Sequence, residues 1–357
     1  MNLWADPRVE AWLYWSAESS TLELTIYSRL AVAGWAPRKY NILISAVVSI
    51  LLASSVSGTD LRVDGQAVLR EAVFQGRHVV SVGGASTEID GDVVVKHGLK
   101  GYRVVAHIQV EDYVAAALES EAQEFQAPEA LKAMAVAVRS YVAANSHKHG
   151  ADADLCDGTH CQRLRFPASS RMRQAAEDTR SEIVWYDKKP AQVYYHQNCG
   201  GATASVASVW GGQGLPYLVS RRDPFCERRP GSWQAQVTKE RLTRVLARST
   251  IPEAERPAEL RILGHNTSGR VSIVQLGTKT WTGARFRELL SGITGQPAIR
   301  SARFSVIESG DHYTFFGRGA GHGVGLCQHG TVARAEAGQG YRQILAAYFP
   351  GTRVSVE

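Results

Sequence analysis

The sequence predicts an α+β protein in which strands and helices mix without regular alternation. Glycine-punctuated, β-branched stretches run from Leu61 to about Val110. Two helical segments follow, over 111–122 and from Pro128 onward, each with apolar residues at helical spacing. Strand-like and helical stretches then follow one another irregularly to the C-terminus, which favours α+β over a repeating βαβ architecture.

The individual elements rest on local signals. Residues 111–122 place their apolar side chains on one stripe, and Pro128 occupies a first helical position, where its missing N–H costs nothing. The alanine-rich run after it is strongly helix-forming. Further short helices are expected at 239–248, at 281–290, capped by Thr280, and at 341–348. The later strand-like segments read EIVWYD, AQVYYHQ, RVSIVQLG and ARFSVIE.

Composition indicates a folded protein with a basic surface. Of the 357 residues, 44% are apolar and 21% charged, and the net charge is +6. A basic surface favours polyanions such as nucleic acid, anionic lipid or acidic wall polymers. The chain has no basic run interleaved with aromatic residues, so we expect no nucleic-acid partner.

An apolar run at 42–56, ILISAVVSILLASSV, follows the basic pair Arg38 and Lys39. This pattern is typical of a signal-peptide core or a short membrane anchor, although a spanning helix needs about 20 residues. The alternative is a buried core helix or strand. We therefore expect an extracytoplasmic protein with an N-terminal segment at 1–41, a signal or membrane anchor at 42–57 and a strand-rich front region at 58–101.

The segment CDGTHC carries metal-ligand chemistry. Cys156, His160 and Cys161 supply thiolates and an imidazole, and His149 at the end of the preceding helix offers a fourth ligand. Zinc prefers four such ligands in a tetrahedron. The alternative is a local disulfide between Cys156 and Cys161.

An acidic patch lies between the two predicted helices, at residues 119–124. Glu121 is placed where the first helix ends and the chain turns. A carboxyl group packed there against apolar neighbours would have a raised pKa and hold the proton that glycosidic cleavage requires. The alternative is a solvated surface glutamate.

Two further motifs suit a sugar ligand. In GRGAGHGVGLCQHG, residues 317–330, His322 and Gln328 are candidates to hydrogen-bond sugar hydroxyls; in YYHQNCGG, Tyr195 and His196 suit a glycan groove, as does Trp210 in VWGG. The alternatives are a glycine-rich turn with a packed histidine, and core packing of the aromatic residues.

Cys199, in YYHQNCGG, and Cys226 present a separate choice. They either pair as a disulfide or remain two buried thiols.

The order of these motifs resembles the SpoIID/LytB family of cell-wall proteins. The resemblance extends over about residues 102–357. It rests on seven motifs that follow one another in the family's order: VEDYVAAALESE, PEALKAMAVAVRSYV, CDGTHCQ, YYHQNCGG, VWGG, GRGAGHGVGLCQHG and YRQILAAYFPGTRV. The resemblance implies one elongated SpoIID-like domain with a catalytic cleft, preceded by a variable front.

The resemblance also implies an activity. The family includes lytic transglycosylases that cleave peptidoglycan between N-acetylmuramic acid and N-acetylglucosamine and leave anhydromuramyl ends. Their catalytic glutamate lies eight residues before the EALKA motif, which corresponds to Glu121. The methionine and proline that usually follow it are replaced here by Ala122 and Gln123.

The expected site is completed by a cofactor and by partners. Some members bind a structural Zn²⁺, and the residues that correspond to its ligands are His149, Cys156, His160 and Cys161. Arg139, Tyr195, His196, His322 and Gln328 are the expected substrate-binding residues. The expected partners are peptidoglycan glycan strands and a cell-wall amidase, and the alternative function is a non-enzymatic wall-binding protein that enhances an amidase.

Overall fold

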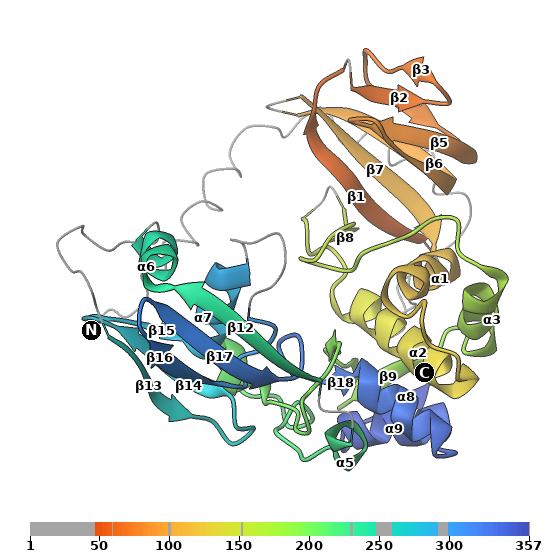
Figure 1. Ribbon diagram of the computed structural model, residues 1–357. Coiled ribbons are helices and arrows are strands. Elements are labelled where there is room, and N and C mark those ends of the chain that lie inside the picture. The colour runs from red at the N-terminus through yellow and green to blue at the C-terminus, as the bar shows by residue number, and fades with distance from the viewer. Residues whose placement is uncertain are drawn as a thin grey trace, which may run out of the picture. The chain divides into compact units, whose positions relative to one another are not determined.

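The computed structural model describes residues 47–58, 60–98, 101–150, 153–228, 231–247, 259–291 and 299–356. Over these residues the fold is α+β, as predicted, with strands concentrated at the front of the sequence and in a later module (Figure 1). In the front region β-branched residues account for the strands and glycines with positive φ for turns between them, and alanine-rich stretches account for the longest helices.

The front of the chain forms an eight-stranded sheet with the order β3-β2-β5-β6-β7-β1-β8, in which β4 pairs with β6. Its strands are β1 (Val47–Val56), β2 (Leu61–Val63), β3 (Gln66–Ala67), β4 (Ala72–Phe74), β5 (Arg77–Val82), β6 (Ala85–Gly98), β7 (Gly101–Gln109) and β8 (Leu155–Cys156). β1 pairs antiparallel with β7 along most of its length and parallel with β8.

Strand β1 corrects the expected signal or anchor at 42–57 for the part of the run that the structure describes. Val48 and Ile50 are buried against the core while their neighbours are partly exposed, so the run is apolar because it is an inner strand. Residues 1–46, with the start of the run, lie outside the described residues. The expected boundary at residue 102 falls inside β7. None of the described helices is long and apolar enough to cross a bilayer.

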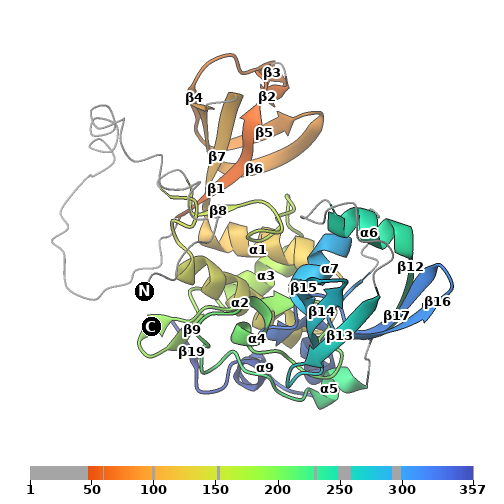
Figure 2. The ribbon, with the colours of Figure 1, turned by 90° about the vertical axis from the view of Figure 1, so that its left-hand side faces the viewer.

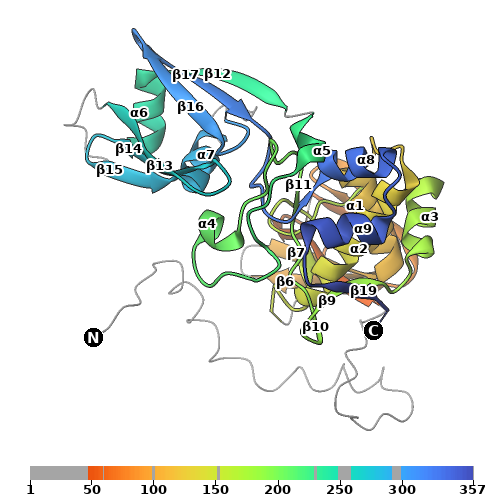
Figure 3. The same cartoon turned by 90° about the horizontal axis from the view of Figure 1, so that it is seen from below.

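A helical layer follows the sheet. β7 leads directly into α1 (Val110–Glu121), and α2 (Pro128–Ala144) contacts α1, α3 (Ser170–Asp178), α8 (Gln328–Glu336) and α9 (Tyr341–Tyr348). Figure 3 shows α8 and α9 alongside α2. The many buried alanines of α2 let these neighbours approach closely, which brings the first and the last motifs of the sequence together.

Short elements connect this layer to the C-terminal motifs. The sheet β10-β9-β19 consists of β10 (Lys189–Pro190), β9 (Ile183–Tyr186) and β19 (Arg353–Ser355). β11 (Tyr195–His196) pairs parallel with β18 (Leu326–Cys327), and the short helices are α4 (Val206–Trp210) and α5 (Pro224–Glu227). The pairing of β11 with β18 places YYHQNCGG beside the glycine-rich motif.

Residues 232–318 form a module with its own hydrophobic core around Phe286, Phe304 and Phe315. It contains β12 (Ser232–Thr238), β17 (His312–Arg318), β16 (Phe304–Ser309), β13 (Leu260–His265), β14 (Val271–Leu276), β15 (Lys279–Thr282), α6 (Lys239–Ala247) and α7 (Gly283–Ser291). Figure 2 shows α7 against β14 and β15.

Helix α7 starts two residues later than expected. Thr280 and Trp281 are paired with β14, so they belong to a strand. Thr282 accepts a hydrogen bond from the backbone N–H of Arg285 at 3.2 Å and is the residue that caps the helix.

Candidate functional site

Glu121 is the last residue of α1, so its backbone carbonyl has no partner within the helix. Gln328, the first residue of α8, donates its side-chain Nε2–H to that carbonyl at 3.0 Å, across 207 residues of sequence. The glycine-rich motif therefore fixes the end of α1. Gln328 was predicted to bind sugar hydroxyls, but its amide nitrogen is used to position Glu121, and its side chain is mostly buried.

The Glu121 carboxyl is partly buried, and burial raises its pKa. A backbone hydrogen bond and the charge of Arg163 act in the opposite direction without cancelling the effect. A carboxyl with a raised pKa retains its proton at a higher pH than an exposed glutamate, as a general acid requires.

Glu119 has the opposite environment. Burial alone would raise its pKa, but hydrogen bonds from Ser169 bring the pKa below its ordinary value, helped by the charges of Arg165 and Arg171. The backbone N–H of Ser169 lies 2.9 Å from Glu119 Oε2. The two carboxyl groups at the end of α1 therefore differ. The Glu119 carboxylate is held as an anion that supports the start of α3, whereas the pKa of Glu121 is raised.

The turn after Glu121 is fastened by arginines. Arg165 donates to the side-chain oxygen of Gln123 at 3.0 Å, and Arg171 donates to the Gln123 carbonyl at 2.7 Å and to Gln126 at 2.9 Å. The glutamine that stands where a proline is usual in the family pattern is therefore part of a network that orders this turn.

Tyr195 lies beside the Glu121 carboxyl. Burial first, and then the negative charge of Glu121, raise the pKa of Tyr195 well above its usual value. The strand pairs Tyr195 with Leu326, the residue two before Gln328. The structure therefore brings together three of the predicted site residues at one point: Glu121, Tyr195 and Gln328.

The two histidines hold backbone rather than an open site. His196 is buried and its Nδ1 bonds the Val324 carbonyl at 3.1 Å. His322 Nδ1 accepts from the Val324 N–H at 3.0 Å, and the ring also bonds the backbone of Tyr195. Burial, together with the charge of Arg287, lowers the pKa of His322 to about 3, so the ring is neutral. Both histidines thus fix the glycine-rich loop through its backbone, and a hydrogen bond from His322 to sugar stays a prediction.

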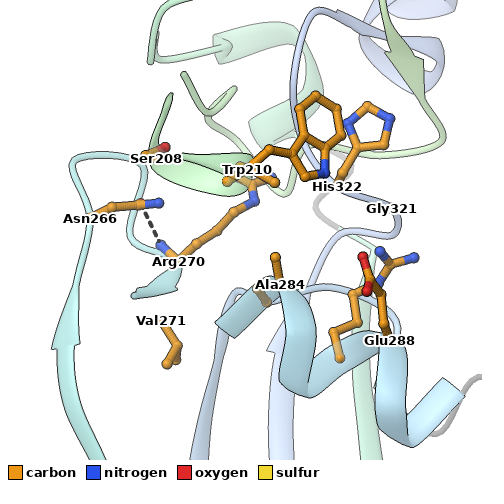
Figure 4. A pocket seen from close by; sticks show the side chains of 12 residues that line it. Ser208, Trp210, Asn266, Arg270, Val271, Ala284, Glu288, Gly321 and His322 are labelled. Atoms are coloured by element: carbon orange, nitrogen blue, oxygen red, sulfur yellow. Dashed lines mark hydrogen bonds between the residues drawn. The ribbon is translucent and has the colours of Figure 1, made fainter. Parts of the chain in front are cut away.

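A pocket opens next to His322 (Figure 4). Figure 4 shows Trp210 and His322 together at one wall, and Glu288 on α7 at another. The Trp210 and His322 rings lie 5.0 Å apart, and Trp210 is 46% exposed, which is unusual for so large an apolar side chain. An exposed indole face next to polar side chains is suited to stacking on a sugar ring. Arg287 completes the polar wall.

Arg139 has a role different from the predicted one. Its side chain is fully buried and forms an ion pair with Glu111, with Nε 3.1 Å from Oε1. Its remaining nitrogens donate to the carbonyls of Ala176 and Glu182, each at 3.0 Å. Arg139 therefore ties α1 and α2 to the end of α3 and does not face a substrate.

The four predicted metal ligands meet at one point, which we term the loop cluster: His149, Cys156, His160 and Cys161. Their ligand atoms lie within 4.8 Å of one another, with 3.4 Å from His149 Nε2 to Cys161 Sγ and 3.7 Å from Cys156 Sγ to His160 Nδ1. Both sulfurs are free thiols. Two sulfur and two imidazole donors are a set that suits zinc.

Of the two alternatives for Cys199 and Cys226, the structure shows the buried free thiols and not the disulfide. Cys327 joins them. The sequence indicated no role for this third cysteine, because nothing in the spacing along the chain connects it with the other two.

Comparison with known proteins identifies the chain. A family model described as "Stage II sporulation protein", SpoIID, matches residues 99–186, which contain Glu121 and the loop cluster. Over these residues the chain matches the SpoIID family, which supports a cell-wall-related SpoIID protein.

Relatives of this SpoIID protein extend over most of its length. A stage II sporulation protein D of Bacillus amyloliquefaciens is 26% identical, over 82% of this chain and 88% of the relative. An uncharacterized protein of Brachyspira hyodysenteriae is 29% identical, over 70% of this chain and 68% of its own length. An amidase enhancer of Bacillus subtilis is 25% identical over 64% of this chain, which is 38% of that relative.

Proposed function

We propose that this SpoIID protein is an extracytoplasmic lytic transglycosylase. It cleaves peptidoglycan glycan strands between N-acetylmuramic acid and N-acetylglucosamine and leaves anhydromuramyl ends. The observation that carries the proposal is the partly buried Glu121 carboxyl, whose pKa is raised and whose backbone is fixed by Gln328. Such a carboxyl is a proton donor held in a defined position.

One carboxyl group suffices for both halves of the reaction. Protonated Glu121 donates its proton to the glycosidic oxygen as the bond to the muramyl anomeric carbon breaks. The resulting carboxylate then accepts the proton of the muramyl residue's own primary hydroxyl, whose oxygen bonds to the anomeric carbon. The proton returns to Glu121 and no water is consumed, whereas a hydrolase needs a second carboxylate.

The residues of the loop cluster fit a structural zinc ion. Because four protein ligands fill a tetrahedral site, the ion would stabilise the fold and leave no position for an activated water. Its ligands end two residues before Arg163, whose backbone bonds the Glu121 carboxyl. A metal here would therefore hold the segment that faces the acid.

Trp210 provides a stacking surface for glycan beyond the acid. Tyr194 links the two regions, because its ring lies 5.0 Å from Trp210 and it directly precedes Tyr195 beside Glu121. We assign the Trp210 pocket to sugar units away from the cleaved bond.

The activity is tested by digestion of purified peptidoglycan, intact and amidase-stripped, with mass spectrometry of the soluble products. Wild-type protein should release anhydromuramyl ends, and Glu121→Gln should release none. Glu124→Gln is the matched control, since Glu124 lies three residues on and is exposed. Equal anhydromuramyl release by wild type and Glu121→Gln would refute the assignment of the acid.

The amidase enhancer among the relatives supports a second function. A non-enzymatic enhancer would bind the glycan and raise the rate of a cell-wall amidase without Glu121 chemistry. Rates of peptide release by an amidase, measured with wild type and Glu121→Gln, separate the two. Full enhancement by both proteins, with no anhydromuramyl product from either, would replace the transglycosylase by the enhancer.

A further inference from the structure

The three cysteines outside the loop cluster gather around one carboxylate. Cys199, Asp223, Cys226 and Cys327, here termed the buried thiol cluster, have ligand atoms that all lie within 4.8 Å of one another. All four residues are buried. They come from three separate segments: the loop after β11, the start of α5, and β18 at the start of α8.

The Cys327 sulfur faces backbone hydrogen-bond donors, whereas the Cys199 thiol donates to Asp223 Oδ2 at 3.7 Å and the Cys226 thiol to Asn198 Oδ1 at 3.2 Å. Cys327 Sγ accepts from the backbone N–H of Cys199 at 3.2 Å and from that of Gly330 at 3.4 Å, where it caps the N-terminus of α8. Backbone N–H donors and a helix N-terminus stabilise a metal-bound thiolate at Cys327, whereas burial raises the pKa of the free thiol. A thiolate is the form of cysteine that binds metal.

Positive charge is also built into the surroundings. Arg334 lies 3.2 Å from Asp223 Oδ1, and Arg270, fully buried, donates to the Cys199 carbonyl at 2.9 Å. In the described part of the chain, the Nε–H groups of both arginines are buried without a hydrogen-bond partner. Three thiolates and a carboxylate carry four negative charges, which one divalent cation and these two guanidinium groups balance.

The carboxylate is fixed in place before any ion binds. Tyr348 donates its hydroxyl to Asp223 Oδ2 at 2.6 Å. Gly330 leaves the space for this contact, because a Cβ atom there would lie 2.1 Å from the Tyr348 hydroxyl oxygen and 2.3 Å from Asp223 Oδ2. A preorganised ligand loses little freedom on binding metal.

A disulfide accounts for this cluster less well than a metal. Any one disulfide would use two of the three sulfurs and leave the third thiol buried beside a carboxylate. Zinc–sulfur bonds of about 2.3 Å place two sulfurs of a tetrahedral site about 3.8 Å apart. The ligand atoms of the cluster lie within 4.8 Å of one another, so they need to move only slightly closer to bind the ion. We propose that Cys199, Asp223, Cys226 and Cys327 form a second metal site, for Zn²⁺, separate from the loop cluster.

The second site would fix the segments that contact the Glu121 region. Cys327 directly precedes Gln328, which fixes the end of α1, and its strand partner His196 follows Tyr195. Binding would release the thiol protons to solvent and clamp β11, α5 and α8 to one another. This role does not depend on the reaction that the protein catalyses.

Metal content of the full chain tests the site. The protein is purified with Zn²⁺ under reducing conditions and freed of excess metal. Elemental mass spectrometry is then expected to give two zinc ions per chain. A Cys156→Ser/Cys161→Ser variant, which removes the loop cluster, should retain one. Asp223→Asn keeps the size of the side chain and should lower the zinc content of that double variant further.

Cobalt provides the independent readout. In the Cys156→Ser/Cys161→Ser variant, Co²⁺ should give an intense thiolate-to-cobalt absorption, which Cys226→Ser should reduce. If the double variant fails to fold, wild-type stoichiometry decides, and one zinc ion per chain overturns the proposal. A disulfide between two cysteines of the buried thiol cluster also overturns the proposal. In zinc-purified protein it would appear as an intact mass two hydrogens below that of the reduced protein, and peptide mapping would locate it.

Discussion

At the residue scale, Glu121 is held in an environment that favours its protonated form. Its raised pKa means that the folded state binds the proton more tightly than the unfolded state. The stability that this group contributes is therefore present below the unfolded pKa, about 4.3, and is lost as the pH rises through the raised folded value. The burial that raises the pKa of Glu121 therefore lowers the stability of the protein at neutral pH.

Glu121→Gln is accordingly expected to stabilise the protein at neutral pH. The amide is uncharged and retains an oxygen for the Arg163 backbone bond, so the melting temperature should rise by about 1–3 °C at pH 7. Below pH about 4 the two proteins should melt alike. Coincident melting curves of Glu121→Gln and wild type from pH 4 to 8 would contradict a destabilising buried charge.

Arg139 is the second residue whose environment makes a quantitative prediction. Arg139→Leu leaves the Glu111 carboxylate partly buried without its partner, so the free energy of unfolding should fall by about 3–5 kcal/mol. Arg173→Leu removes an exposed ion pair with Asp112 and should cost about 1 kcal/mol or less. Urea unfolding of both variants checks this, and a loss of glycan binding by Arg139→Leu without a loss of stability would restore the predicted substrate role.

Individual residues also differ in how well the sequence predicts their surroundings. Glu121 and the four residues of the loop cluster were singled out from motifs, because their chemistry depends on residue type and short spacing, and the structure brings those four residues together. The hydrogen bond of Gln328 to the Glu121 carbonyl and the burial of Arg139 were not predicted, and the packing of His196 was only one of two alternatives. These depend on which distant backbone atoms meet each side chain, and no local pattern carries that information.

At the scale of elements, α8 acts on α1 through a single side chain. Gln328→Ala removes the donor to the Glu121 carbonyl, so the end of α1 should loosen. We expect a decrease of about tenfold in kcat with little change in KM, because the acid is displaced while the sugar surface is intact. Gln174→Ala, on exposed α3, is the control. An unchanged kcat for Gln328→Ala would show that this bond does not position the acid.

The loop cluster makes the second prediction at this scale. Removal of metal by a chelator should lower the melting temperature and the rate of anhydromuramyl release together, and added Zn²⁺ should restore both. An ion present at a thousandfold its Kd contributes about 4 kcal/mol to folding. The Arg163 backbone bond to Glu121 explains why activity should follow stability. Activity that persists in metal-depleted, folded protein would sever this link.

Element prediction succeeded for α1, α2 and α9, whose apolar spacing and alanine content are strong local signals. It failed for β1, because an inner strand of one sheet and a membrane segment share the same apolar composition. Only the pairing of β1 with β7 distinguishes them, and pairing is a property of two segments.

At the scale of the whole molecule, β1 belongs to the folded unit that carries the site. A chain shortened to begin at Gly58 loses the partner of both β7 and β8, and β7 leads directly into α1. Its soluble yield and its cooperative thermal transition should both be lost, whereas the full-length protein should keep both. Replacement of Val48 and Ile50 by aspartate should have the same effect, and a cooperative transition in the shortened chain would contradict the role of β1.

The pairing of β1 with β8 also sets an order of events for the growing polypeptide. The backbone of Ser49 bonds the side chain of Asp154, 105 residues later. A chain that emerges N-terminus first, from a ribosome or through a translocation pore, must therefore leave one edge of this apolar strand unpaired until residue 156 has appeared. During that interval the strand edge is open to other chains. Assistance from a holding factor would matter most before the Cys156 segment is released.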